Sequence, residues 1–123
     1  MQLSDAEWIV MNLIWDSHPV DAHFVTDQLG EANSWSAATV KTMLHRLVKK
    51  GALSHTADGK RYLYRAKVRR SSCVREASGS FLRRVFRGQA APALLHFVKA
   101  AKLSADDIAE LRAILNEKDQ RNE

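Results

Sequence analysis

The dipeptide Asp58-Gly59 stands between two short segments with strand character, and it constrains the fold more than any other feature of the sequence. The segments are Leu53–Thr56 and Arg61–Tyr64. A tight turn between antiparallel strands needs residues that tolerate positive φ, as Asp and Gly do. The sequence therefore predicts a two-stranded hairpin here, and the helical periodicity on both sides of it predicts a mainly α-helical chain.

The N-terminal segment carries the signature of a helix start. Ser4 is followed three residues later by Glu7, and this capping box predicts that a helix begins at Asp5. Apolar residues then recur at three- and four-residue spacing, which predicts a largely buried helix that ends near His18-Pro19.

Two further helices are predicted before the hairpin. Asp21 can cap the first of them, and Gly30 is expected to stop it. The second is bounded by Ser36 as N-cap and Gly51 as C-terminal glycine, and its inward face consists of Val40, Met43, Leu44 and Leu47. Three helices followed by a hairpin is the order of a winged helix-turn-helix, in which the hairpin is the wing.

The helix that follows Ser36 has the chemistry of a DNA recognition helix. Its remaining faces carry small, hydroxyl and basic side chains, which can bond to base edges and phosphates in the major groove. Lys60 and Arg61 at the hairpin tip are expected to contact the DNA backbone or the minor groove. The predicted DNA-binding residues of the helix are Ser36, Thr39, Lys41, Thr42 and Arg46.

The distribution of charge supports this interpretation. Residues 41–87 hold 14 of the 19 Lys and Arg residues of the chain, and their only acids are Asp58 and Glu76. A solvated helix face or a hairpin that closes a core would each explain one of these patterns alone. Their combination in this order favours nucleic-acid binding.

The C-terminal part of the chain has helical patterns with large apolar faces. Short helices of about 50 residues in total cannot bury that much apolar surface alone, so a homodimer is predicted. We therefore divide the chain into a winged-helix DNA-binding domain, residues 1–68, and a helical dimerisation domain, residues 69–123. The predicted dimerisation residues are Phe81, Leu82, Val85, Phe86, Leu94, Leu95, Phe97, Val98, Ile108, Leu111, Ile114 and Leu115.

Other classes of function find little support. Cys73 is the single cysteine, which excludes an internal disulfide, and it is either a redox sensor in basic surroundings or a packing residue. The five histidines lack the spacing of a metal site and no catalytic motif is present, so neither an enzyme nor a cofactor is expected. Without a signal peptide pattern or a membrane-length apolar segment, a cytoplasmic protein without membrane contact is expected.

Motifs spread over nearly the whole chain are similar to those of one family. They are Ser4–Met11, Ile14-Trp15, Trp35-Ser36, Thr39-Val40, Thr42-Met43, Arg46-Leu47 and Lys49–Gly51, followed by Ser80–Leu82, Gly88, Leu95–Val98, Leu103-Ser104 and Ile108–Leu111. Together they resemble the penicillinase repressor family of winged-helix transcriptional repressors, which includes methicillin-resistance and copper-responsive members.

The resemblance implies a homodimer whose two winged helices bind double-stranded operator DNA at an inverted repeat and block transcription until an inducing signal arrives. Ala37 and Ala38 stand where the best-studied members have Pro and Lys, which predicts a different operator. The cysteine-rich tail of the copper-responsive members is missing.

The resemblance also implies a route of induction. In the β-lactam-responsive members a membrane sensor leads to proteolysis between an Asn and a Phe. The matching bond here is His96-Phe97, so the Asn is replaced. A sensor-linked protease is the partner that this route would require.

Two alternatives stay open. A less specific, architectural DNA-binding protein would show little preference for one operator over competitor DNA. A protein-interaction module that retains a winged helix would bind its partner equally well without Lys41 and Arg46.

Overall fold

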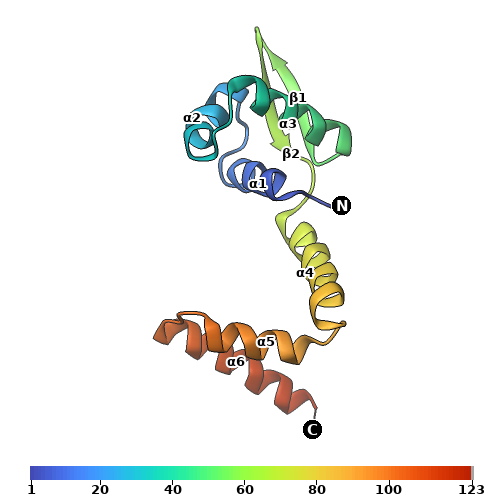
Figure 1. Cartoon of the computed structure of the whole chain (residues 1–123), viewed down its shortest axis with the longest axis vertical. Coiled ribbons are helices and arrows are strands. Elements are labelled where there is room, and N and C mark those ends of the chain that lie inside the picture. Colours follow the sequence, from blue (N-terminus) through green and yellow to red (C-terminus); the bar gives the residue numbers. More distant parts are fainter. Residues whose placement is uncertain (123) are drawn as a thin grey trace. The chain divides into compact units, whose positions relative to one another are not determined.

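The computed structural model describes residues 1–122 and shows six helices and one hairpin (Figure 1). The fold class predicted from the sequence, mainly α with a small β-wing, is confirmed. Residue 123, the end of the predicted dimerisation domain, lies outside the described residues. The elements are α1 (Asp5–Ser17), α2 (Ala22–Asn33), α3 (Ala37–Lys50), β1 (Leu53–Asp58), β2 (Arg61–Ala66), α4 (Arg70–Phe86), α5 (Ala90–Ala100) and α6 (Ala105–Arg121).

Local capping signals set most helix ends where the sequence predicts them. The side chain of Ser4 accepts a hydrogen bond from the backbone N–H of Glu7 at 3.2 Å, and the backbone N–H of Ser4 donates to Glu7 Oε1 at 2.8 Å. Asp21 caps α2 and Ser36 caps α3, while Gly51 ends α3 with φ of 89°. These caps satisfy backbone groups that a helix end leaves without partners.

One predicted boundary is wrong. Gly30 does not stop α2, which continues to Asn33 and ends at Ser34 in the left-handed conformation. Gly30 is buried within the helix, and a Cβ atom there would lie 2.9 Å from the carbonyl oxygen of Trp35. The glycine therefore allows the close approach of the α2–α3 connection, and the turn after the helix is made by Ser34.

The base of the hairpin packs against the core of the fold. β1 and β2 pair in antiparallel register from Leu53↔Ala66 to Asp58↔Arg61. Val20, in the connection between α1 and α2, exchanges two backbone hydrogen bonds with Tyr64 at 3.1 and 2.7 Å. Leu53 and Tyr64 are buried, whereas the remainder of β1 is exposed. The outer half of the hairpin thus projects from the core (Figure 1).

Residues 1–78 form one compact unit, whose core lies among the first three helices and the base of the hairpin. The inward face predicted for α3 is confirmed, with Met43 half-buried beside three fully buried residues. The largest fully buried side chains are Val10, Met11, Ile14, Val25, Val40, Leu44, Leu47 and Leu53. Burial of this face leaves the opposite face of α3 in solvent.

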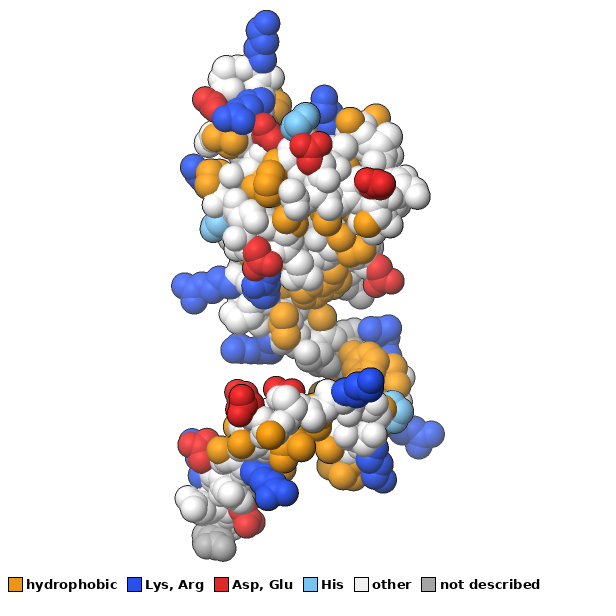
Figure 2. Space-filling view, turned by 90° about the vertical axis from the view of Figure 1, so that its left-hand side faces the viewer, with side chains coloured by type: hydrophobic (Ala, Val, Ile, Leu, Met, Phe, Trp, Pro, Cys, Tyr) orange, Lys and Arg blue, Asp and Glu red, His pale blue; other side chains and the backbone are white. Residues whose placement is uncertain are grey.

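A second compact unit begins at Gly79, within α4. The boundary between functional domains at residues 68 and 69 stays a prediction. From Gly79 to residue 122, Ala93 is the only buried residue, and hydrophobic side chains reach the surface of these helices (Figure 2). Phe81, Phe86 and Phe97 form a small cluster with ring centroids 5.8–6.4 Å apart. This unit therefore has little core of its own.

The close approach at Gly30 predicts that Gly30→Ala destabilises the fold, although alanine is the better helix former. We expect a loss of about 1–3 kcal/mol, because the added methyl group meets backbone that must shift. In the matched control Gly79→Ala, the new Cβ meets only the flexible end of Arg83, and we expect a gain of about 0.5–1 kcal/mol. Urea unfolding measures both, and a stabilised Gly30→Ala variant would contradict this account.

Candidate nucleic-acid interface

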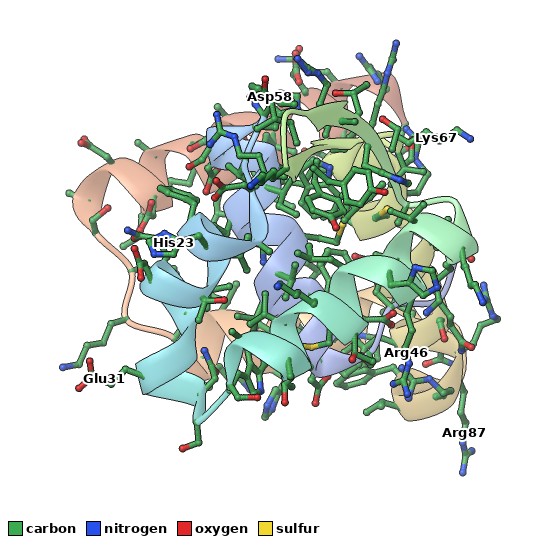
Figure 3. All side chains as sticks on the ribbon, turned by 90° about the horizontal axis from the view of Figure 1, so that it is seen from above. His23, Glu31, Arg46, Asp58, Lys67 and Arg87 are labelled. Carbon is green, nitrogen blue, oxygen red and sulfur yellow. The ribbon has the colours of Figure 1, made fainter. Side chains whose placement is uncertain are left out.

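α3 turns one face to the core and the opposite face to solvent. Figure 3 shows Arg46 pointing outward from this helix. α3 contains no acidic residue and ends in Lys49 and Lys50. The predicted recognition residues are all exposed, namely Ser36, Thr39, Lys41, Thr42 and Arg46. The structure thus gathers them on the solvent side of one basic helix.

The hydroxyl groups on this face already make hydrogen bonds within the helix. Ser36 Oγ accepts from the backbone N–H of Thr39 at 3.1 Å, and the two hydroxyl oxygens are also 3.1 Å apart. Thr42 donates its hydroxyl proton to the carbonyl of Ala38 at 3.0 Å. The Thr42 oxygen is therefore left to accept hydrogen bonds, and its methyl group is left for apolar contact. Ser36 serves first as a helix cap.

The cationic side chains of α3 differ in whether they form salt bridges within the protein. Lys41, Arg46 and Lys49 take part in no salt bridge among residues 1–122. Lys50 instead donates to Glu7 Oε1 at 2.8 Å and to the carbonyl of Gln2 at 2.9 Å. Three positive side chains are thus free to meet an anion, and the fourth holds the helix in place.

Besides capping α1, Glu7 binds Lys50 at the end of α3. Its side chain is 12% exposed, and one oxygen accepts from both Ser4 and Lys50. Burial acts to raise the pKa of Glu7, but the hydrogen bonds from Lys50 and Ser4 outweigh it and hold the pKa below its usual 4.5. The pair ties the C-terminal end of α3 to the start of α1, across a sequence separation that no local pattern signals.

A shallow hollow with a volume of about 490 Å³ lies between the start of α1 and the last two turns of α3. Its cations extend the basic surface of α3 toward the N-terminus of α1, where the helix dipole also favours negative charge. The residues that line it are Ser4, Ala6, Glu7, Met43, Arg46, Lys49 and Lys50.

The two predicted wing residues have different surroundings. Lys60, at the hairpin tip, is exposed and makes no salt bridge within the described part of the chain. Arg61 donates to Asp21 Oδ2 at 2.8 Å and to Asp58 Oδ2 at 3.0 and 3.1 Å; Figure 3 shows Asp58 at the hairpin. The backbone N–H of Phe24, followed by the guanidinium of Arg61, lowers the pKa of Asp21. Arg61 is thus paired with two carboxylates of its own chain.

The predicted dimerisation residues fall into two groups. Phe81, Leu82, Phe86 and Leu111 are half-buried within their own unit. The side chains of the other eight are 40–60% exposed, namely Val85, Leu94, Leu95, Phe97, Val98, Ile108, Ile114 and Leu115. The second group is available to another molecule without any rearrangement of the chain.

Other chemistry has little structural basis. Cys73 is buried, and burial raises the pKa of its thiol, whereas a redox sensor needs an accessible thiol with a low pKa. Of the two interpretations of Cys73, packing is the one that fits. Residues 1–122 contain no cluster of three or more His, Cys, Asp or Glu side chains suited to a metal ion. No helix in this range is long and apolar enough to cross a membrane.

Comparisons with known proteins agree with this arrangement. The sequence pattern described as penicillinase repressor matches residues 3–117. A penicillinase repressor of Bacillus licheniformis is 38% identical over 120 residues, covering 98% of this chain and 94% of that protein. The methicillin resistance regulatory protein MecI of Mammaliicoccus sciuri is 36% identical over 117 residues, covering 95% of each.

A solved relative shares this fold over part of the chain. It is the solution structure of monomeric BlaI from Bacillus licheniformis in complex with the blaP half-operator, with 39% identity and a TM-score of 0.51. The match covers 58% of this chain and 87% of that one. The winged-helix architecture predicted from the sequence is thereby confirmed.

The contact between Glu7 and Lys50 predicts a stability that depends on pH. Because the pKa of Glu7 is lowered in the folded chain, its contribution is complete above the unfolded pKa and is lost as the pH falls through the folded value. At neutral pH we expect Glu7→Gln to cost about 1 kcal/mol, and the difference from wild type to shrink below pH ~4.5.

Urea unfolding of both proteins between neutral and acid pH measures this effect. Glu31→Gln, on the exposed surface of α2, is the matched control, for which no comparable loss at neutral pH is expected. An equal cost of Glu7→Gln at every pH would contradict the assignment.

Proposed function

The chain belongs to the penicillinase repressor family, and we propose that it acts as a homodimer that binds an inverted-repeat operator until an inducing signal arrives. As a member of this family it is a DNA-binding transcriptional repressor, and no enzymatic activity is assigned to it. The observation that carries the proposal is the exposed, acid-free face of α3, on which Lys41, Arg46 and Lys49 form no salt bridge within the described residues. A repressor acts on the chromosome, so we place it in the cytoplasm.

α3 is the element that enters the major groove. Lys41 and Arg46 reach guanine or phosphate oxygens, since both are exposed and neither forms a salt bridge within residues 1–122. Thr39 and Thr42 offer methyl groups to thymine and oxygen acceptors to exocyclic amines. Lys60 contacts the DNA backbone from the wing tip. With these contacts, one winged helix covers one half-site of the operator.

Dimerisation rests on the apolar surface of the C-terminal helices. A unit of about 40 residues usually needs a metal, a disulfide or a partner chain to be stable, and this one buries only Ala93 among its described residues. A second copy would cover the eight exposed apolar side chains. A two-fold symmetric pair would then present two recognition helices to two half-sites of opposite orientation.

For induction we extend the proposal to cleavage of the bond between His96 and Phe97 by a sensor-linked protease. Both residues are exposed, and both lie inside α5. Hydrolysis within a helix requires local opening of that helix. The cut would separate α6 from the winged helix and so divide the apolar surface that the dimer needs.

Selection of binding sites from genomic DNA, followed by titration of the best site against a scrambled duplex, tests the function. We expect a short inverted repeat with half-sites about one helical turn apart, bound at least about 10³-fold more tightly than the scrambled duplex. Equal and strongly salt-dependent binding to both duplexes would instead indicate an architectural protein. Absence of binding would indicate a protein-interaction module.

The role of α3 predicts that Arg46→Ala lowers operator affinity about tenfold or more, the cost of one good contact to a base or phosphate. Arg112→Ala, which removes the same charge from α6, is the control and should bind as the wild type does. Fluorescence anisotropy titrations at several salt concentrations measure both variants. Wild-type affinity of Arg46→Ala would remove α3 from the interface.

The dimer predicts a clear difference between two substitutions on α6. Leu115 is 58% exposed, so Leu115→Asp leaves the single chain folded but places a charge in the covered surface. Ala113, also exposed, lies on another side of the helix, because residues two apart do not share a face. We expect sedimentation to show a monomer for Leu115→Asp and a dimer for Ala113→Asp. A stable dimer of Leu115→Asp would contradict this interface.

A further inference from the structure

We propose that Arg61 is a positioning residue, which ties the wing to the start of α2 and thereby sets the direction in which Lys60 meets the DNA backbone. We call Asp21, Arg61 and Asp58 the wing clamp. The inference rests on the proposed function for its effect on DNA. The clamp itself is a property of the free protein and can be measured there.

The segment between α1 and α2 contacts β2 at two points. Val20 pairs with Tyr64 through two backbone hydrogen bonds, and the next residue, Asp21, accepts a hydrogen bond from the guanidinium of Arg61. Tyr64 and Arg61 are three residues apart on the strand, a span of about 10 Å. Two attachment points at this spacing fix the angle of a strand, whereas a single point leaves it free to pivot.

The outer half of the hairpin has little other support. β1 is exposed beyond Leu53, and Tyr62 on β2 is 52% exposed. A two-stranded ribbon is at best marginally stable without packing against another element. The tie between Arg61 and Asp21 joins this ribbon to α2, and Asp58 holds the same guanidinium from within the turn region.

The two oxygens of Asp21 have separate tasks. Oδ1 accepts from the backbone of Phe24 and caps α2, while Oδ2 accepts from Arg61. Asp21→Asn can therefore keep the cap, because asparagine is as good an N-cap as aspartate. The amide nitrogen that replaces Oδ2 cannot accept a hydrogen bond, so the substitution cuts the tie alone.

A direct contact between Arg61 and phosphate predicts the opposite effect. If Arg61 bound DNA, loss of the Asp21 carboxylate would release it and strengthen binding. Asp58→Asn is the matched control, since it removes a carboxylate from the same guanidinium but leaves the tie to α2. The turn is preserved in this variant, because its positive φ is that of Gly59, which is unchanged, and Asp58 is the last paired residue of β1.

Hydrogen exchange of the free protein is the first measurement. We expect the amides of the outer hairpin to exchange faster in Asp21→Asn than in the wild type, with those of α2 unchanged. Titration on the selected operator comes second. We expect Asp21→Asn to lower affinity about two- to fivefold, as for loss of one exposed ionic contact, and Asp58→Asn not to lower it.

In the background of Lys60→Ala, Asp21→Asn should have no further effect, because its consequence passes through Lys60. Binding of Asp21→Asn at wild-type affinity would overturn the proposal, and tighter binding would overturn it and make Arg61 a direct contact. Unchanged hydrogen exchange in the hairpin would also overturn it. If the wild type itself prefers no operator, the proposed function fails, and hydrogen exchange alone decides whether the clamp exists.

Discussion

Burial of one face of α3 is the constraint on which the rest of the winged helix depends. Val40, Leu44 and Leu47 are fully buried, and the residues between them, apart from the half-buried Met43, are turned outward as a consequence. The helix can therefore be both a core element and the most basic exposed element of the domain. Its position is then fixed at its C-terminal end by the pair of Lys50 and Glu7.

The two compact units differ in how much of their apolar surface they bury. The N-terminal unit buries enough apolar surface to hold a rigid recognition surface. The C-terminal unit leaves most of its apolar side chains exposed, and we propose that a second copy of the chain covers them. A repressor needs both properties, because rigid half-site readers gain affinity and specificity only when they are joined in a fixed symmetric arrangement.

Local chemistry explains what could be predicted from the sequence. The caps at Ser4, Asp21 and Ser36 and the turn at Gly59 each depend on a few neighbouring residues, and all are found. The errors and omissions involve contacts made in three dimensions. The role of Gly30 depends on the path of the chain beyond the helix, and the partner of Arg61 lies 40 positions away. Local sequence patterns do not predict contacts between residues that are far apart in the chain.

We propose that two copies of the chain read two half-sites together. The affinity and stoichiometry of the wild type on a full inverted repeat and on one isolated half-site test this most directly. We predict two chains on the full repeat and an affinity at least about 10²-fold higher than on the half-site. One chain per duplex, with equal affinity for both, would contradict the account.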